Sequence, residues 1–118
     1  MQVSIIGEKT LTFSKKIVKV YRLLLKNKEF VLSKQLLRSA TSIGANTAEA
    51  IFAQSKRDFL SKLTIALKEA FETRYWLLLL QEERWAGIDY QVYLDDVLEI
   101  IKILTAITKK LKERLNGS

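Results

Sequence analysis

Apolar residues recur at every third or fourth position over most of the chain, a spacing typical of amphipathic α-helices. Proline is absent and glycine occurs only four times, so few residues interrupt this pattern. The spacing predicts four helices, over about residues 10–28, 33–51, 56–84 and 89–116. Since the loops between them are short, we expect an all-α fold, an antiparallel up-down-up-down four-helix bundle in a single domain over residues 1–118.

The helix starts carry their own signals. Ser33 and Asp89 can each cap the helix that follows, and Ser55 with Asp58 has the spacing of a capping box. The residues expected to face the core are Phe13, Ile17, Val20, Leu24, Leu36, Ala40, Ile43, Thr47, Ile51, Phe59, Leu63, Ala66, Ala70, Leu77, Val97, Ile100, Leu104, Ile107 and Leu111, with Phe71 and Leu78 beside them.

Small and polar side chains share the second predicted helix. Ala40, Gly44 and Ala48, spaced by four, let a neighbouring backbone approach closely. A polar line runs beside them, formed by Ser39, Ser42, Asn46 and Glu49. Because buried polar groups need partners, we expect a hydrogen-bond network between helices that involves Arg38 and residues of the third helix, with Glu69, Glu72 and Arg74 as candidates. Recognition of a small polar ligand by Arg38, Asn46 and Glu49 is the less favoured interpretation.

The absence of cysteine and histidine removes several common catalytic and metal-binding groups. Without cysteine or histidine, the chain lacks a thiolate nucleophile, an imidazole base and the usual zinc ligands. Glu69 and Glu72 can in principle hold a hard cation, but the Glu-x-x-His spacing of di-iron bundles is missing. We therefore expect a non-enzymatic protein with no cofactor and no metal. The unbroken apolar run of residues 76–80 is too short to cross a membrane, and no signal peptide is evident, so we expect a cytoplasmic location.

Charge is unevenly distributed along the chain, whose formal net charge is +7. Residues 9–38 hold nine basic residues and one acid (+8), whereas residues 69–99 hold eight acids and two arginines (−6). Four cations form a line along the first helix, which we call the basic stripe: Lys15, Lys19, Arg22 and Lys26. The basic stripe is a candidate nucleic-acid surface, and a merely solvated face is the alternative. Lys109 and Lys112 are weaker candidates, because cations in a last helical turn also complement the helix dipole.

The run Trp-Leu-Leu-Leu-Leu at residues 76–80 is apolar on every side of the third helix. A helix in a monomeric bundle should expose one polar side to water, so we expect Trp76, Leu79 and Leu80 to contact another subunit. Base stacking by Trp76 or Trp85 is the less favoured interpretation, since both lie in the acidic part of the chain.

Two segments of the chain resemble a known protein family: SKQLLRSATSIGANTAEA and SKRDFLSKLTIALKEAFETRYWLLL. They resemble the four-helix-bundle proteins encoded by intervening sequences in 23S ribosomal RNA genes, a family similar to the accessory proteins of diversity-generating retroelements. The family pattern falls on Arg38, Ala40, Ser42, Ile43, Asn46, Ala48, Glu49, Ser55, Asp58, Phe59, Ile65, Ala66 and Glu72. Thr47, Ala50, Ala53 and Lys68-Glu69 depart from it, and Ala53 stands where the family often has an arginine.

The resemblance implies a four-helix protomer in a ring-like homo-oligomer, a pentamer, with a basic surface. The retroelement relatives bind RNA and a reverse transcriptase, so RNA or DNA and a reverse transcriptase or other protein are the partners that it implies. We interpret the chain as a homo-oligomer that binds nucleic acid through its basic first helix. The alternative is a purely structural or protein-interaction oligomer whose charged surfaces serve assembly alone.

Overall fold

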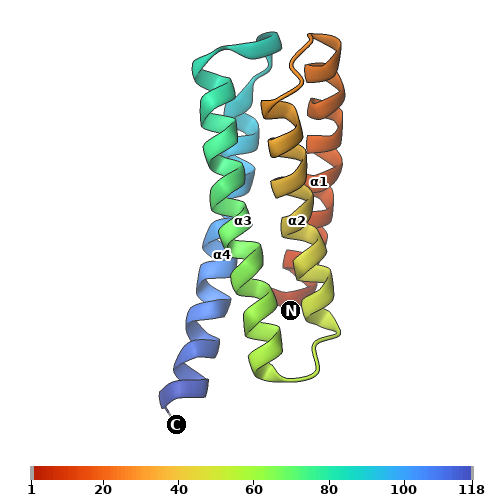
Figure 1. Ribbon diagram of the computed structural model, residues 1–118. Coiled ribbons are helices and arrows are strands. Elements are labelled where there is room, and N and C mark those ends of the chain that lie inside the picture. The colour runs from red at the N-terminus through yellow and green to blue at the C-terminus, as the bar shows by residue number, and fades with distance from the viewer. Residues whose placement is uncertain (1, 118) are drawn as a thin grey trace.

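A computed structural model describes residues 2–117, with side chains from residue 5 onward. It contains the helices α1 (Gln2–Lys26), α2 (Leu32–Ile51), α3 (Lys56–Glu82) and α4 (Tyr90–Gly117), with a short 3-10 turn, η1 (Trp85–Gly87), before α4. The four helices lie side by side and alternate in direction (Figure 1). The all-α, up-down-up-down four-helix bundle is therefore confirmed. The end residues of the predicted 1–118 domain, 1 and 118, lie outside the described part.

α1 begins eight residues earlier than predicted, at Gln2 instead of Thr10. Ile6 and Thr10 are both buried and continue the inner face of Phe13 and Ile17 at the same spacing. A threonine in the apolar stripe and a glycine at position 7 obscure this periodicity in the sequence. The Thr10 hydroxyl tolerates burial because it donates a hydrogen bond to the Gly7 carbonyl at 3.1 Å.

The turn between α1 and α2 is built around Glu29 and not around Ser33. Lys28 adopts a left-handed conformation (φ 64°), and the Glu29 N–H donates to the Leu24 carbonyl at 2.9 Å, so α1 ends at Lys26. The Glu29 carboxylate accepts from the backbone N–H groups of Val31 and Ser33. The prediction that Ser33 caps α2 is wrong: α2 begins at Leu32, and Ser33 is a buried residue within it.

The caps of α3 and α4 follow the sequence more closely. The Ser55 hydroxyl accepts from the Asp58 N–H at 3.0 Å, which confirms Ser55 as the cap of α3. The Asp58 carboxylate accepts in return from the N–H of Gln54, one residue before the expected donor. Asp89 accepts from the Gln91 N–H at 3.2 Å at the start of α4.

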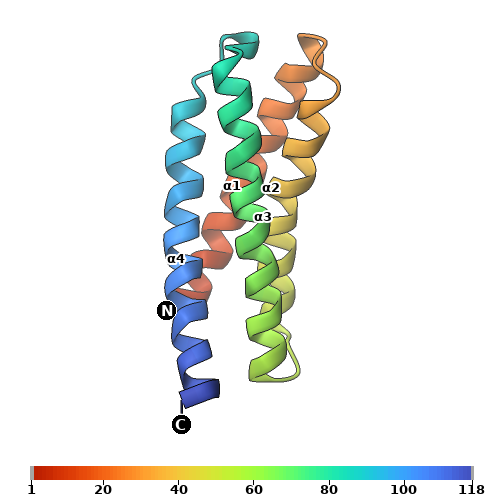
Figure 2. The ribbon, with the colours of Figure 1, turned by 60° about the vertical axis from the view of Figure 1, so that its left-hand side comes forward.

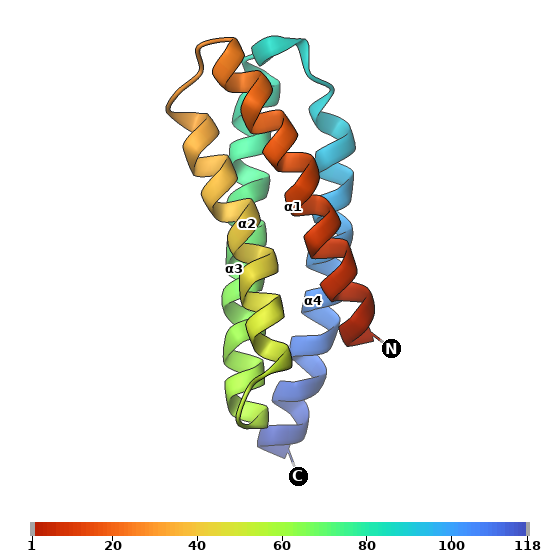
Figure 3. The ribbon, with the colours of Figure 1, turned by 90° about the vertical axis from the view of Figure 1, so that its right-hand side faces the viewer.

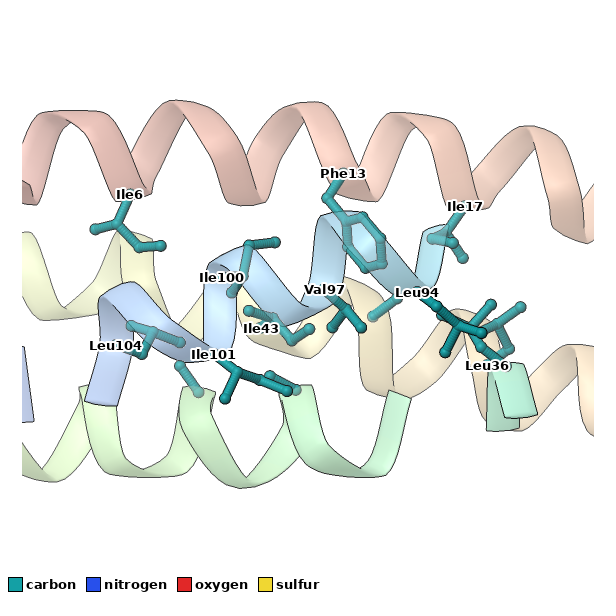
Figure 4. Close-up of a cluster of buried hydrophobic side chains, with 14 of the residues drawn as sticks. Ile6, Phe13, Ile17, Leu36, Ile43, Leu94, Val97, Ile100, Ile101 and Leu104 are labelled. Carbon is teal, nitrogen blue, oxygen red and sulfur yellow. The ribbon is translucent and has the colours of Figure 1, made fainter. Parts of the chain in front are cut away.

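The core runs along the bundle axis and combines side chains from all four helices (Figure 4). Most of the predicted core residues are buried, including Phe13, Ile43 and Leu104. One expected core position is wrong, since Ile51 is about half exposed, and Phe71, expected beside the core, is exposed to the same extent. Leu78, expected beside the core, is also exposed. The long apolar run of α3 hid which side of the helix faces inward.

The helices form a square in which α1 packs on α2 and α4, and α3 packs on the same two helices. α1 and α3 therefore occupy diagonal corners, and Figure 2 shows α1 behind α3 with α2 and α4 to either side. The N-terminal half of α1 leans away from α2 toward α4 (Figure 3). Among the described residues, none of the helices combines the length and the apolar character that a membrane crossing requires.

Candidate nucleic-acid interface

The basic stripe is exposed along its whole length. Lys15, Lys19, Arg22 and Lys26 all present their side chains to solvent, and none of the ion pairs among residues 5–117 involves them. At 1.5 Å of rise per residue the stripe extends over roughly 16 Å of the helix. Four unpaired cations in a row repel one another. Binding of an anionic partner relieves this repulsion and is therefore favourable.

Two other cations of α1 are paired within the chain. Lys9 Nζ lies 2.6 Å from the Glu99 carboxylate, and Lys16 Nζ lies 3.0 Å from that of Asp96. Both acids belong to α4, so these pairs hold the leaning half of α1 against α4. Glu99 and Asp96 thus pair with lysines outside the basic stripe, and the four cations of the stripe form no ion pair with them.

Lys109 and Lys112 are exposed but lie far from the basic stripe. α1 and α4 are antiparallel, and the C-terminal end of α4 projects past the N-terminal end of α1 (Figure 1). The basic stripe occupies the opposite half of α1. The structure therefore does not bring the two groups of cations together into one surface.

Arg38 links α2 to α3 through two carboxylates. Its guanidinium lies 3.1 Å from Glu69 and also contacts Glu72. The other role of Glu72 is to accept a hydrogen bond from the Trp76 indole N–H at 2.9 Å. Below this network, the buried Thr73 hydroxyl donates to the Ser39 hydroxyl at 2.9 Å. These contacts fix α2 against α3, and both carboxylates that a cation would need are occupied by Arg38.

The remaining motif residues have local roles. The Asn46 amide donates to the Ser42 carbonyl at 2.9 Å and to the Ser42 hydroxyl at 3.1 Å. The prediction that Asn46 bonds to α3 is therefore wrong, because both of its partners lie on α2. Glu49 pairs with Lys62 of α3 at 3.1 Å. Phe59 is partly buried against the core. The motif residues therefore mainly join α2 to α3, and they do not converge on a ligand site.

A family model for the 23S rRNA-intervening sequence protein matches residues 3–106 of the chain. The chain belongs to this family. It is also similar to a crystal structure of a protein of unknown function from the S23 ribosomal protein family of Bacteroides thetaiotaomicron. The two are 49% identical with a TM-score of 0.88, over 92% of this chain and 99% of the other. No curated protein matches the sequence.

The expected subunit contact of this family member needs correction at one residue. Leu80 is fully buried inside its own bundle, with 0% of its surface exposed, so it has no surface to offer another copy. Leu79 is half-buried, and Trp76 is partly buried with its indole N–H bonded to Glu72. The residue of the run that faces outward is Leu78, because the inward face of α3 passes through Leu77 and Leu80.

The sequence interpretation also missed exposed apolar groups in this family member. On α3, Phe71, Tyr75 and Leu78 are 53%, 56% and 37% exposed and lie along one line of the helix; we call them the α3 ridge. Between α1 and α2 lies an apolar groove of about 630 Å³. It is lined by Gly7, Glu8, Thr10, Leu11, Ser14, Thr41, Gly44, Ala45, Ala48 and Ile51; we call it the α1–α2 groove. The spacing of Ala40, Gly44 and Ala48 was the available signal for it.

Proposed function

We propose that this chain is a non-enzymatic, homo-oligomeric cytoplasmic protein that binds RNA as an accessory factor, through the basic stripe on α1. The observation that carries the proposal is the contrast between the two groups of cations on α1. Lys9 and Lys16 are paired with carboxylates, whereas Lys15, Lys19, Arg22 and Lys26 are exposed and unpaired. A straight row of free cations suits the backbone of a polyanion.

RNA is favoured over DNA because the retroelement accessory proteins that the family resembles bind RNA. Recognition through lysine and arginine on the outside of one helix neutralises phosphates and carries little sequence information. We therefore expect affinity for structured and single-stranded RNA without strong sequence preference. The homo-oligomer, a pentamer by resemblance, would repeat the basic stripe around the particle and raise the avidity for one long RNA.

Charge reversal on α1 tests this proposal. Lys19→Glu/Lys26→Glu removes two cations of the basic stripe, and neither residue lines the α1–α2 groove, so the groove stays intact. Lys56→Glu/Lys102→Glu is the matched control, because both of these lysines are exposed, unpaired and on other helices. Binding is measured by fluorescence anisotropy with a labelled RNA hairpin and a DNA hairpin of the same sequence.

We expect the α1 variant to bind the RNA hairpin at least about tenfold more weakly than the control, since each lost phosphate contact weakens binding at moderate salt. Equal affinity in the two variants contradicts the proposal and favours an oligomer whose charges serve assembly alone. Equal affinity of the wild-type protein for both hairpins would keep the basic stripe as the site but contradict the choice of RNA.

A further inference from the structure

We infer that Phe30, in the turn between α1 and α2, stacks on an unpaired base of the RNA that the basic stripe binds. The inference rests on the proposed function and deepens it by naming the substrate class, which is RNA with unpaired nucleotides. The basic stripe holds the phosphates of this RNA, and the turn holds one of its bases. Stacking requires a base whose face is free, which a continuous duplex does not offer.

The turn exposes apolar surface that the bundle does not use. Phe30 and Val31 are 55% and 71% exposed, although turn positions are mostly occupied by glycine, proline and small polar residues. Both residues lie between α1 and α2, at the end of the bundle opposite the C-terminus (Figure 1). An exposed aromatic ring offers a flat face that a base can cover, and burial of that face is favourable.

The backbone on both sides of Phe30 is fixed by hydrogen bonds. The Glu29 N–H donates to the Leu24 carbonyl at 2.9 Å, and the Glu29 carboxylate accepts from the N–H groups of Val31 and Ser33. The Phe30 ring is therefore carried by an ordered turn. Such a ring loses little conformational entropy when a base stacks on it, because only two side-chain torsions remain to be fixed.

Three exposed lysines lie within four residues of Phe30 along the chain: Lys26, Lys28 and Lys34. Four residues span at most about 14 Å, so the phosphates beside a stacked base lie within reach of these flexible side chains. None of the three lysines forms an ion pair within residues 5–117. Lys26 ends the basic stripe, and Lys28 and Lys34 extend the positive surface past the end of α1.

The turn carries little negative charge. Glu29 is the one acid between residues 9 and 48, and it is only 7% exposed, with its carboxylate bonded to backbone N–H groups. Lys34 lies in the first turn of α2, where the helix dipole disfavours a cation, so the stability of α2 does not explain its charge. An exposed ring among unpaired cations is typical of surfaces that bind single-stranded nucleic acid.

The other exposed aromatic rings lie away from the basic stripe. Phe71 and Tyr75 belong to α3, at the corner of the bundle diagonal to α1. Phe52 follows α2 at the other end of the bundle, about 30 Å of helix from Phe30 (Figure 1). Among the side chains that the structure describes, Phe30 is thus the exposed aromatic ring next to the last cation of the basic stripe.

Two RNA strands separate the base contact from the phosphate contacts. One is an oligouridylate of about ten nucleotides, and the other is an abasic strand of the same length, with the same ribose phosphates and no bases. Affinity is measured by fluorescence anisotropy. Phe30→Leu removes the ring but keeps an apolar side chain, and Phe52→Leu is the matched control at the other exposed phenylalanine of a turn. Circular dichroism and light scattering check that both variants keep the fold and the mass of the wild-type particle.

The wild type and Phe52→Leu should bind the oligouridylate about tenfold more tightly than the abasic strand, which is the effect of one stacked base. Phe30→Leu should bind the two strands with nearly equal affinity, and it should bind the abasic strand as tightly as the wild type does. Phe30→Trp should keep the preference, and the fluorescence that it adds to that of the wild type should be quenched by the oligouridylate and not by the abasic strand.

Equal affinity of the wild type for the two strands overturns the inference, and so does a Phe30→Leu variant that keeps the tenfold preference. An anionic membrane is the other surface that suits an apolar ring among lysines. Sedimentation with vesicles of phosphatidylserine and phosphatidylcholine examines it. Vesicle binding that depends on Phe30, together with equal affinity for the two strands, would assign the turn to a membrane and overturn the inference.

Failure of this inference and failure of the proposed function give different results. Lys19→Glu/Lys26→Glu removes phosphate contacts and should weaken binding of both strands by the same factor, whereas Phe30→Leu should affect the oligouridylate alone. If the charge variant loses both strands and Phe30→Leu changes nothing, the proposed function stands and the inference fails. If the charge variant binds both strands like the wild type, the proposed function fails, and a base preference that depends on Phe30 still supports the contact at the turn.

Discussion

Glu29 and Ser33 form two hydrogen bonds with each other at the turn between α1 and α2. The Glu29 carboxylate accepts a hydrogen bond from the Ser33 backbone N–H at 2.5 Å, and the Ser33 hydroxyl donates to the Glu29 carbonyl at 2.8 Å. Both residues are buried. A charged side chain therefore serves as the cap of α2 from a position three residues before the helix begins, where its negative charge also complements the helix dipole.

Replacement of Glu29 by alanine should destabilise the bundle. The backbone N–H groups of Val31 and Ser33 would lose their acceptor, at a cost of about 2 kcal/mol in the free energy of unfolding. Urea unfolding followed by circular dichroism measures this change. Glu83→Ala, at an exposed position without an ion pair, is the control and should change stability by less than about 0.5 kcal/mol. Similar losses in the two variants would show that Glu29 is not the cap.

Tyr90 should make the protein sensitive to alkali. Burial raises the pKa of its hydroxyl from 10.0 to about 12, and the charges of Glu29 and Tyr93 add to this effect. Below pH 10 the hydroxyl is protonated in both the folded and unfolded states, so its titration contributes nothing there. Above pH 10 the unfolded chain releases this proton while the folded chain keeps it, so the free energy of unfolding falls as pH rises toward 12.

Comparison with Tyr90→Phe isolates this contribution from all other effects of pH on stability. The variant loses the hydrogen bond from the Tyr90 hydroxyl to the Trp85 carbonyl and should be about 1 kcal/mol less stable at neutral pH. Between pH 10 and 12 the wild type should lose up to about 2 kcal/mol more than the variant in urea unfolding. Parallel pH profiles would contradict the assigned role of Tyr90.

Substitution of Arg38 and of Glu72 should lower the free energy of unfolding by different amounts. Arg38 is half exposed, so Arg38→Ala should cost no more than about 1 kcal/mol. Glu72→Ala also leaves the Trp76 indole N–H without its acceptor and should cost more, whereas Glu72→Gln keeps an acceptor and should be intermediate. Urea unfolding measures the losses, and Trp76 fluorescence should shift only in the Glu72→Ala variant. Equal losses for Arg38→Ala and Glu72→Ala would contradict a structural role of the indole bond.

Gly44 should accept alanine but no larger residue. The Cβ of alanine would lie 3.2 Å from the Ser14 hydroxyl, which can rotate away, and 3.4 Å from the Thr10 carbonyl, an ordinary contact. The gain in helix propensity, up to about 1 kcal/mol, should make Gly44→Ala neutral to stabilising. Gly44→Leu should instead separate α1 from α2 and lower the unfolding midpoint in urea. A strong loss in Gly44→Ala would contradict the assumed freedom of Ser14.

Periodicity predicted the helices well, because most inner faces repeat without interruption. It placed the start of α1 too late, since Thr10 interrupts an apolar face that continues to Ile6. It missed the cap of α2 because the capping group comes from Glu29 by way of a turn with a left-handed residue, which no short motif signals. Where a helix begins and which group caps it therefore depend on tertiary contacts that the local sequence pattern does not contain.

The candidate site was predictable only in part. The basic stripe follows directly from helical spacing, because its four cations lie on one side of α1. Pairing of Lys9 and Lys16 with α4, which separates them from the basic stripe, depends on how α1 leans. In the run of residues 76–80 every position is apolar, so the sequence did not show that Leu80 faces inward and Leu78 outward.

The dependence of RNA affinity on salt tests the central claim most directly. If the basic stripe neutralises three or four phosphates, the logarithm of the association constant should fall linearly with the logarithm of salt concentration, with a slope of about −3. Lys19→Glu/Lys26→Glu should bring the slope to about −1, since each lost phosphate contact removes nearly one unit. An affinity that does not change with salt, or a slope that is the same in the variant, would contradict the assignment of α1 as the RNA-binding surface.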